Sequence, residues 1–240
     1  MQSLLEHLKI SISDLLETLG LVMTRPWKMA AAVFTGGNVL ESALLYFGCL
    51  LGASLLLVLF PFNLGDEFLS YAQSVVITSC VVLLVTSVLL HWGLKLCRVP
   101  ISFQKALTIN CFISGAYVLA LSIGIALATS LIAILAPDSK QEFAALTLGC
   151  IPIFAYTSAG PALVAPAFGF AVHAAISLLS FAFSVFLTSG VFVGLAPYRK
   201  SSAFTYCLVA VGVFALDYVA SAAFSGLQIN TDSAYCRALG

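Results

Sequence analysis

The chain has 240 residues, of which 61% are hydrophobic and 8% are charged, and its formal net charge is zero. Soluble domains carry roughly 25% charged residues, and a chain of this length has too little interior to hide so much apolar surface, so most of it must face lipid. The neutral balance excludes the basic footprint of a nucleic-acid-binding protein. None of the seven cysteines stands in a CxxC pair, so we expect neither a disulfide framework nor a metal site.

The first 24 residues have the periodicity of an amphipathic helix. Its apolar stripe consists of Leu4, Leu8, Ile12, Leu15, Leu16, Leu19 and Met23. We expect Pro26 to end this helix, because proline cannot donate the next backbone hydrogen bond. Trp27 and Lys28 follow, and both residue types are common at a membrane interface. Two placements are open: the helix lies on the membrane surface, or it packs on the protein's own membrane spans.

Five apolar runs are each long enough to cross a bilayer as a helix, which needs about 20 residues. They lie near residues 40–60, 72–91, 106–135, 168–196 and 204–224. None shows the alternation of a strand, so we predict an all-α polytopic membrane bundle over residues 39–224. A cytosolic segment, 1–38, precedes it and an outer tail, 225–240, follows. The stretch 144–160 is a sixth span, a re-entrant segment or an interfacial hairpin.

The positive residues indicate the orientation, because Lys and Arg in short loops stay on the cytoplasmic side. With five spans and the N-terminus inside, the inner side holds Lys9, Arg25, Lys28, Lys95, Arg98, Lys105, Arg199 and Lys200, and the outer side holds Lys140 and Arg237. A sixth span would turn this ratio of eight to two into seven to three, so the rule favours five. We expect Lys95, Arg98, Lys105, Arg199 and Lys200 to hold the loops on the cytoplasmic face, where they also meet partners or lipid headgroups.

Two ionisable residues stand inside the apolar runs, where a charge costs about 2.5–3.5 kcal/mol. His173 lies in the fourth run and Asp217 in the fifth, at a similar distance from the outer ends of their runs. A hydrogen bond or ion pair between them would satisfy both groups. It would serve as a clamp between helices or as a proton- or cation-sensitive site.

Two pairs of glycines have the GxxxG spacing that lets helices approach closely. Gly48 and Gly52 lie in the first run, and Gly190 and Gly194 lie in the fourth. We expect both pairs to serve helix packing within one chain, and a homo-oligomer interface is the alternative.

Catalysis is not expected. The chain has no HExxH pattern, and its only histidines are His7, His91 and His173. Ser177 and Ser180 are near His173, but they lack the glycine context of an oxyanion hole. No catalytic residue and no cofactor site follow from the sequence.

Three stretches resemble the Yip family, five-span membrane proteins that interact with Ypt/Rab GTPases and have bacterial relatives. Pro26–Trp27 is similar to the proline–aromatic lead-in to the family's first span. Ser102, Phe103, Gln104 and Ala106 resemble the start of its third span. The junction of its last two spans is similar to the set Gly194, Leu195, Arg199, Lys200, Ser202 and Ala203.

The resemblance covers about residues 20–225. It implies a cytosolic N-terminus, five spans, an outer or lumenal C-terminus, and a non-enzymatic scaffold that organises the membrane or binds a protein at its cytosolic face. The Asp-Leu-Tyr-Gly-Pro-like motif of Rab-binding members is absent, and Pro100 stands where the family tends to have glycine. We therefore expect a bacterial-type inner-membrane protein, or an endomembrane protein in a eukaryote, without a Rab-type GTPase partner. The alternative is a small channel or transporter that uses His173 and Asp217.

Overall fold

The computed structural model describes residues 12–37, 39–62, 68–148 and 167–227, and no strand occurs among them. The α-helices are α2 (Ile12–Thr24), α3 (Pro26–Thr35), α4 (Leu40–Phe62), α5 (Phe68–Leu96), α6 (Phe103–Leu135), α7 (Lys140–Thr147), α9 (Ala167–Leu195) and α10 (Ala203–Leu227). Two short 3-10 turns, Pro137–Ser139 and Ala196–Tyr198, follow α6 and α9. The predicted all-α class is therefore confirmed.

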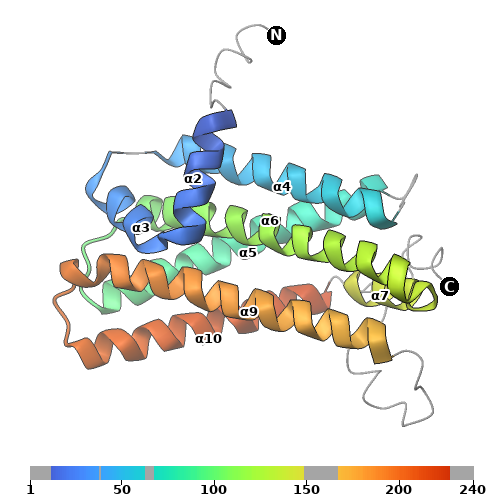
Figure 1. Cartoon of the computed structure of the whole chain (residues 1–240). Helices are drawn as coiled ribbons and strands as arrows, with labels where there is room; N and C mark the ends of the chain where they lie inside the picture. The colour runs from blue at the N-terminus through green and yellow to red at the C-terminus, as the bar shows by residue number, and fades with distance from the viewer. Residues whose placement is uncertain (1–11, 38, 63–67, 149–166, 228–240) are drawn as a thin grey trace, which may run out of the picture.

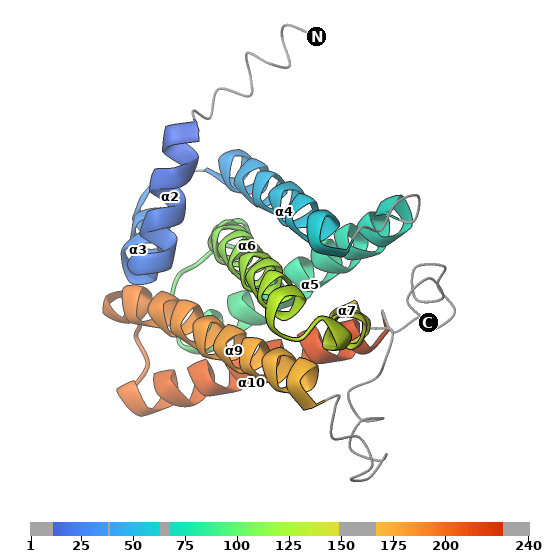
Figure 2. The same ribbon diagram turned by 45° about the vertical axis from the view of Figure 1, so that its right-hand side comes forward.

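The five long helices run side by side in alternating directions (Figure 1). Helix α6 is central, since it packs against α2, α3, α4, α5, α7 and α9. Helix α4 lies on one side of the bundle and packs mainly on α6, whereas α10 lies on the other side and packs chiefly on α5 (Figure 2).

Four helical stretches are long and apolar enough to cross a membrane: Leu40–Val58, Phe68–Leu96, Phe103–Leu135 and Phe168–Tyr198. Only 22 to 39% of the residues in their most apolar windows are buried inside the protein. The outward surface is also apolar, with Ile134 77% exposed and Leu179 70% exposed. Exposing so much apolar surface to water would be strongly unfavourable, so this is an integral membrane protein.

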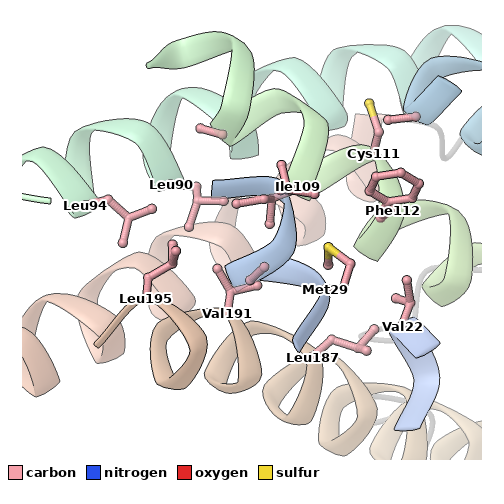
Figure 3. Packing of buried hydrophobic residues seen from close by; sticks show 14 of the residues in the cluster. Val22, Met29, Leu90, Leu94, Ile109, Cys111, Phe112, Leu187, Val191 and Leu195 are labelled. Atoms are coloured by element: carbon pink, nitrogen blue, oxygen red, sulfur yellow. The ribbon is translucent and has the colours of Figure 1, made fainter. Parts of the chain in front are cut away.

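The largest group of buried side chains extends through the bundle and includes residues of α2 and α3 as well as of the five long helices. Val22 of α2 and Met29 of α3 are almost fully buried. Figure 3 shows Met29 among Phe112 of α6 and Leu187 and Val191 of α9. The N-terminal helices therefore pack on the membrane bundle, and they do so through apolar side chains.

Pro26 does end α2, but it also begins α3 as the first helical residue. Proline suits this position, because the N–H groups of the first helical turn have no acceptor within the helix, and proline therefore loses no hydrogen bond there. The predicted lead-in to the first span is thus a second helix. Leu15 and Leu19 of α2 pack against the core, whereas Leu16 is 58% exposed. Residues 1–11 lie outside the described part.

The stretch 144–160 is described only at its start. Helix α7 ends at Thr147 and packs against α6 and α9, and residues 149–166 lie outside the described part. The end of α6 and the beginning of α9 lie at the same end of the bundle (Figure 1).

Candidate functional site at the basic end

Positive charge gathers at one end of the bundle, which we call the basic end. It comprises the corner of α2 and α3, the end of α5, the start of α6 and the turn between α9 and α10 (Figure 1). These segments carry seven of the eight described Lys and Arg residues: Arg25, Lys28, Lys95, Arg98, Lys105, Arg199 and Lys200. Lys140, the eighth, is at the opposite end. Asp14 and Glu17 on α2 and Glu41 at the start of α4 are the described carboxylates near the basic end. Cations outnumber acids there by seven to three.

Lys105 fixes α3 to α6. Its Nζ donates hydrogen bonds to the carbonyl oxygens of Phe34 and of Gly36, which stand at the end of α3. The same ammonium group lies 5.5 Å from the centre of the Phe34 ring. A cation at a helix C-terminus satisfies carbonyls that have no partner within the helix. The role of Lys105 is therefore structural.

Arg199 fixes the turn between α9 and α10 in a similar way. One of its guanidinium nitrogens donates to the Ala196 carbonyl oxygen at 3.3 Å, and the group lies 5.3 Å from the centre of the Tyr206 ring. The Tyr206 hydroxyl in turn donates to the Phe192 carbonyl oxygen at 2.6 Å. These contacts hold the beginning of α10 against the end of α9.

Gly190 and Gly194 form the contact between α9 and the corner of α2 and α3. A Cβ on Gly190 would lie under 3.0 Å from the Pro26 ring, and one on Gly194 would lie under 3.0 Å from the Trp27 backbone. Phe34 and Tyr198 extend this contact, with ring centres 4.3 Å apart. Close packing through these glycines was predicted, but their neighbour is a helix corner and not another span.

Two serines near the basic end cap helices. The Ser102 hydroxyl accepts from the Lys105 backbone N–H at 3.3 Å at the start of α6. The Ser202 hydroxyl accepts from the Thr205 backbone N–H at 3.2 Å at the start of α10. Serine is a preferred residue at this position because its oxygen satisfies an N–H group that the helix leaves free.

The remaining cations of the basic end are exposed. The Nζ of Lys95 lies 5.6 Å from the centre of the Trp92 ring. Arg98 follows the end of α5 and has a left-handed backbone conformation with φ of 57°. Among the described residues, Lys28 and Lys200 have no carboxylate partner and no hydrogen bond from their side chains. The fold therefore does not account for these two charges.

The predicted pair of His173 and Asp217 stays a prediction. His173 is half-buried and its ring centre lies 6.3 Å from that of Phe143 on α7, while the side chain of Asp217 lies outside the described part. Phe181 of α9 and Phe214 of α10 set the register, with ring centres 5.3 Å apart. From this contact His173 lies about 12 Å and Asp217 about 4.5 Å toward the same end, at 1.5 Å per residue. The two backbone positions thus differ by about 7.5 Å along the bundle, and a bond between the two side chains stays a prediction.

An amide inside the bundle has a role that the sequence did not reveal. Asn110 of α6 is buried, and its Nδ2 contacts the Thr86 hydroxyl at 2.6 Å, the Ser87 hydroxyl at 2.9 Å and the Leu83 carbonyl oxygen at 3.1 Å. All three partners are on α5. Hydrogen bonds of this kind hold membrane helices together, so Asn110 clamps α5 to α6.

A cavity of about 120 Å³ lies beside the end of α3 and the start of α6. Its walls include Gly36, Gly37, Gln104 and Lys105. Since Lys105 is already bonded to the backbone of α3, the cavity offers no free charged group. Among the described residues, no three His, Cys, Asp or Glu side chains gather in a way that could hold a metal ion.

Comparison of the chain with protein-family models, with curated proteins and with solved structures finds no match.

Proposed function

We propose that the chain is a non-enzymatic, five-span membrane protein of the Yip type, a scaffold that organises the membrane or binds a partner at its basic end. The observation that carries this proposal is the position of three stretches of the chain. The three stretches that resemble the family are far apart in the sequence, yet they meet at one end of the bundle. Pro26 lies against Gly190, Ser102 caps α6, and Arg199 and Ser202 shape the start of α10.

Two further features support five spans. Helix α10 has 25 residues, which at 1.5 Å each exceeds the roughly 30 Å of a bilayer core. The end of α6 and the beginning of α9 also lie at the same end of the bundle (Figure 1), which supports five spans rather than six. In this arrangement the basic end faces the cytoplasm, as the positive-inside rule requires.

The orientation is tested by labelling single cysteines with a membrane-impermeant maleimide in intact bacteria. Cys97 is a poor probe of the basic end, because it is fully buried and burial raises the pKa of its thiol. Lys200→Cys and Lys140→Cys, each in a chain without other cysteines, place exposed thiols at opposite ends. We expect Lys140→Cys to react at once and Lys200→Cys to react only after the membrane is opened. The reverse order would contradict the proposed topology.

The scaffold function is tested against the channel alternative in proteoliposomes. A scaffold carries no solute, so we expect no flux of protons or monovalent cations across pH or salt gradients. Flux that disappears in His173→Ala would overturn the proposal and restore the channel alternative. A positive test uses a photo-crosslinker at position 200 in native membranes, with position 140 as the control. We expect protein or lipid adducts at position 200 that are lost when residues 1–24 are removed.

A further inference from the structure

We propose that the basic end binds the headgroups of anionic phospholipids through Lys28 and Lys200, with Trp27 at the site. The inference rests on the proposed function and names the class of partner. Two other positive residues of this end, Lys105 and Arg199, are excluded from the site because their side chains are bonded within the fold. Lys105 is bonded to the carbonyl oxygens of Phe34 and Gly36, and Arg199 to that of Ala196.

The two free lysines lie on elements that touch each other. Lys28 follows Trp27, whose backbone lies against Gly194 near the end of α9. Lys200 lies two residues after the 3-10 turn that follows α9, and this turn also meets α3 where the rings of Tyr198 and Phe34 are in contact. Both ammonium groups are exposed. Two free cations thus flank one contact between helices, which is a suitable arrangement for a group with negative charge.

The surroundings of this contact fit a lipid better than a protein. Helix α2 lies crosswise to the long helices near the basic end, as an interfacial helix does (Figures 1 and 2). Its Leu16 is 58% exposed and its Leu21 36%, and the neighbouring Trp27 is also 36% exposed. Tryptophan and exposed leucine at this level mark the boundary between acyl chains and headgroups. A phosphate at the same depth lies within reach of lysine side chains.

The net charge of the basic end gives the sign of the preferred headgroup. Seven cations face three described carboxylates there, so a zwitterionic headgroup gains less than an anionic one. Attraction of a lysine to an anionic leaflet corresponds to a factor of about five in binding for each charge near the surface, and it weakens with salt. Two lysines predict a clear preference for anionic lipid at low ionic strength.

The test uses Trp27 as a fluorescent reporter. The chain has two tryptophans, so Trp92→Phe leaves Trp27 alone. The protein is reconstituted into vesicles of phosphatidylcholine with phosphatidylglycerol, in which one lipid or the other carries brominated acyl chains that quench the fluorescence of Trp27. We expect brominated phosphatidylglycerol to quench several times more efficiently than brominated phosphatidylcholine in low salt, and the preference to fall at 1 M salt.

Variants separate a site from general attraction. Lys28→Gln with Lys200→Gln should bring the two quenching efficiencies close to equal, whereas Lys28→Arg with Lys200→Arg should keep the preference. Lys140→Gln, at the opposite end, should leave it unchanged. Melting temperature is measured for each variant, so that loss of folding is not mistaken for loss of binding.

Three results of the quenching assay would overturn the inference. They are equal quenching by the two lipids at low salt, a preference that survives in the double glutamine variant, and a preference that millimolar inorganic phosphate removes, which would indicate a site for soluble phosphate. An acidic peptide that displaces the lipid would assign the site to a protein partner and also overturn it. None of these results alters the labelling of Lys200→Cys or the flux test, so the inference can fail while the proposed function stands.

Discussion

The two GxxxG pairs of this chain have the same spacing and opposite surroundings. A Cβ on Gly190 or Gly194 would meet Pro26 or the Trp27 backbone, whereas a Cβ on Gly48 or Gly52 would meet no described residue within 4 Å. The spacing shows only that a close approach is allowed. The absent side chains of such a pair leave a shallow notch on the helix surface. What packs into this notch depends on the rest of the fold, and on α9 it is the corner between α2 and α3.

The contrast also separates two kinds of helix surface. The face of α9 that carries Gly190 and Gly194 is an interior contact that positions the basic end. The face of α4 that carries Gly48 and Gly52 is open in the described part of the chain, so it is available to lipid. The sequence predicts packing within the chain at both pairs. Among the described residues, Gly190 and Gly194 lie against Pro26 and Trp27, whereas Gly48 and Gly52 have no such neighbour.

The largest predicted effect comes from adding a methyl group to the filled notch. Gly194→Ala should destabilise the protein by about 1–3 kcal/mol, because backbone atoms of Trp27 stand in the way and cannot rotate aside. Gly52→Ala, the matched control on α4, should be neutral or stabilising by up to about 1 kcal/mol, since alanine favours helix. Unfolding in mixed detergent micelles measures both.

Limited proteolysis gives that comparison a second measurement. In Gly194→Ala the corner of α2 and α3 should lift from α9, so cleavage within residues 12–35 should be faster than in Gly52→Ala. Equal unfolding midpoints and equal cleavage rates in the two variants would show that the notch is not a structural contact.

The next largest effect on stability concerns an interhelical contact made by polar groups. Asn110→Leu removes the amide that bridges to Leu83, Thr86 and Ser87, and we expect a loss of about 1–2 kcal/mol, because interhelical hydrogen bonds in membranes average about 0.6 kcal/mol each. Thr129→Val is the control, since the Thr129 hydroxyl donates within its own helix, to Ile125. If both variants unfold at the same detergent fraction, Asn110 does not clamp α5 to α6.

A smaller effect distinguishes the bonded lysine from a free one. Lys105→Met should cost about 1 kcal/mol, because the carbonyl groups of Phe34 and Gly36 lose a charged donor that is partly exposed to solvent. Lys28→Met should leave the unfolding midpoint unchanged, because Lys28 has no such bond among the described residues. A midpoint for Lys105→Met that matches Lys28→Met would contradict the structural role given to Lys105.

Hydropathy predicted the long helices well, because most side chains that face lipid are apolar and so contribute to the signal. The third run was predicted over 106–135 and α6 spans Phe103–Leu135. The gathering of cations at one end was likewise predicted from charge alone. Both properties are sums over many residues, which makes them insensitive to any single contact.

Contacts between distant segments could not be predicted in this way. Pro26 was interpreted as a helix stop, yet whether a new helix follows depends on the notch of Gly190 and Gly194 that receives it. The level of His173 relative to Asp217 depends on a register that is set by packing, and α10 packs more on α5 than on α9. Nor does the sequence separate Lys105, which the fold uses, from Lys200, which it leaves free.

The smallest predicted effect is a gain in stability at the end of α5. Arg98 has φ of 57°, and the Val99 N–H donates to the Leu94 carbonyl oxygen at 3.0 Å, which together form the Schellman ending that usually holds glycine. Arg98→Gly should relieve the left-handed strain and stabilise by about 0.5 kcal/mol, after the greater chain entropy of glycine is subtracted. Arg98→Ala removes the same charge but keeps the strain, so it should show no gain. If alanine and glycine behave alike, charge and not backbone conformation determines the stability of this turn.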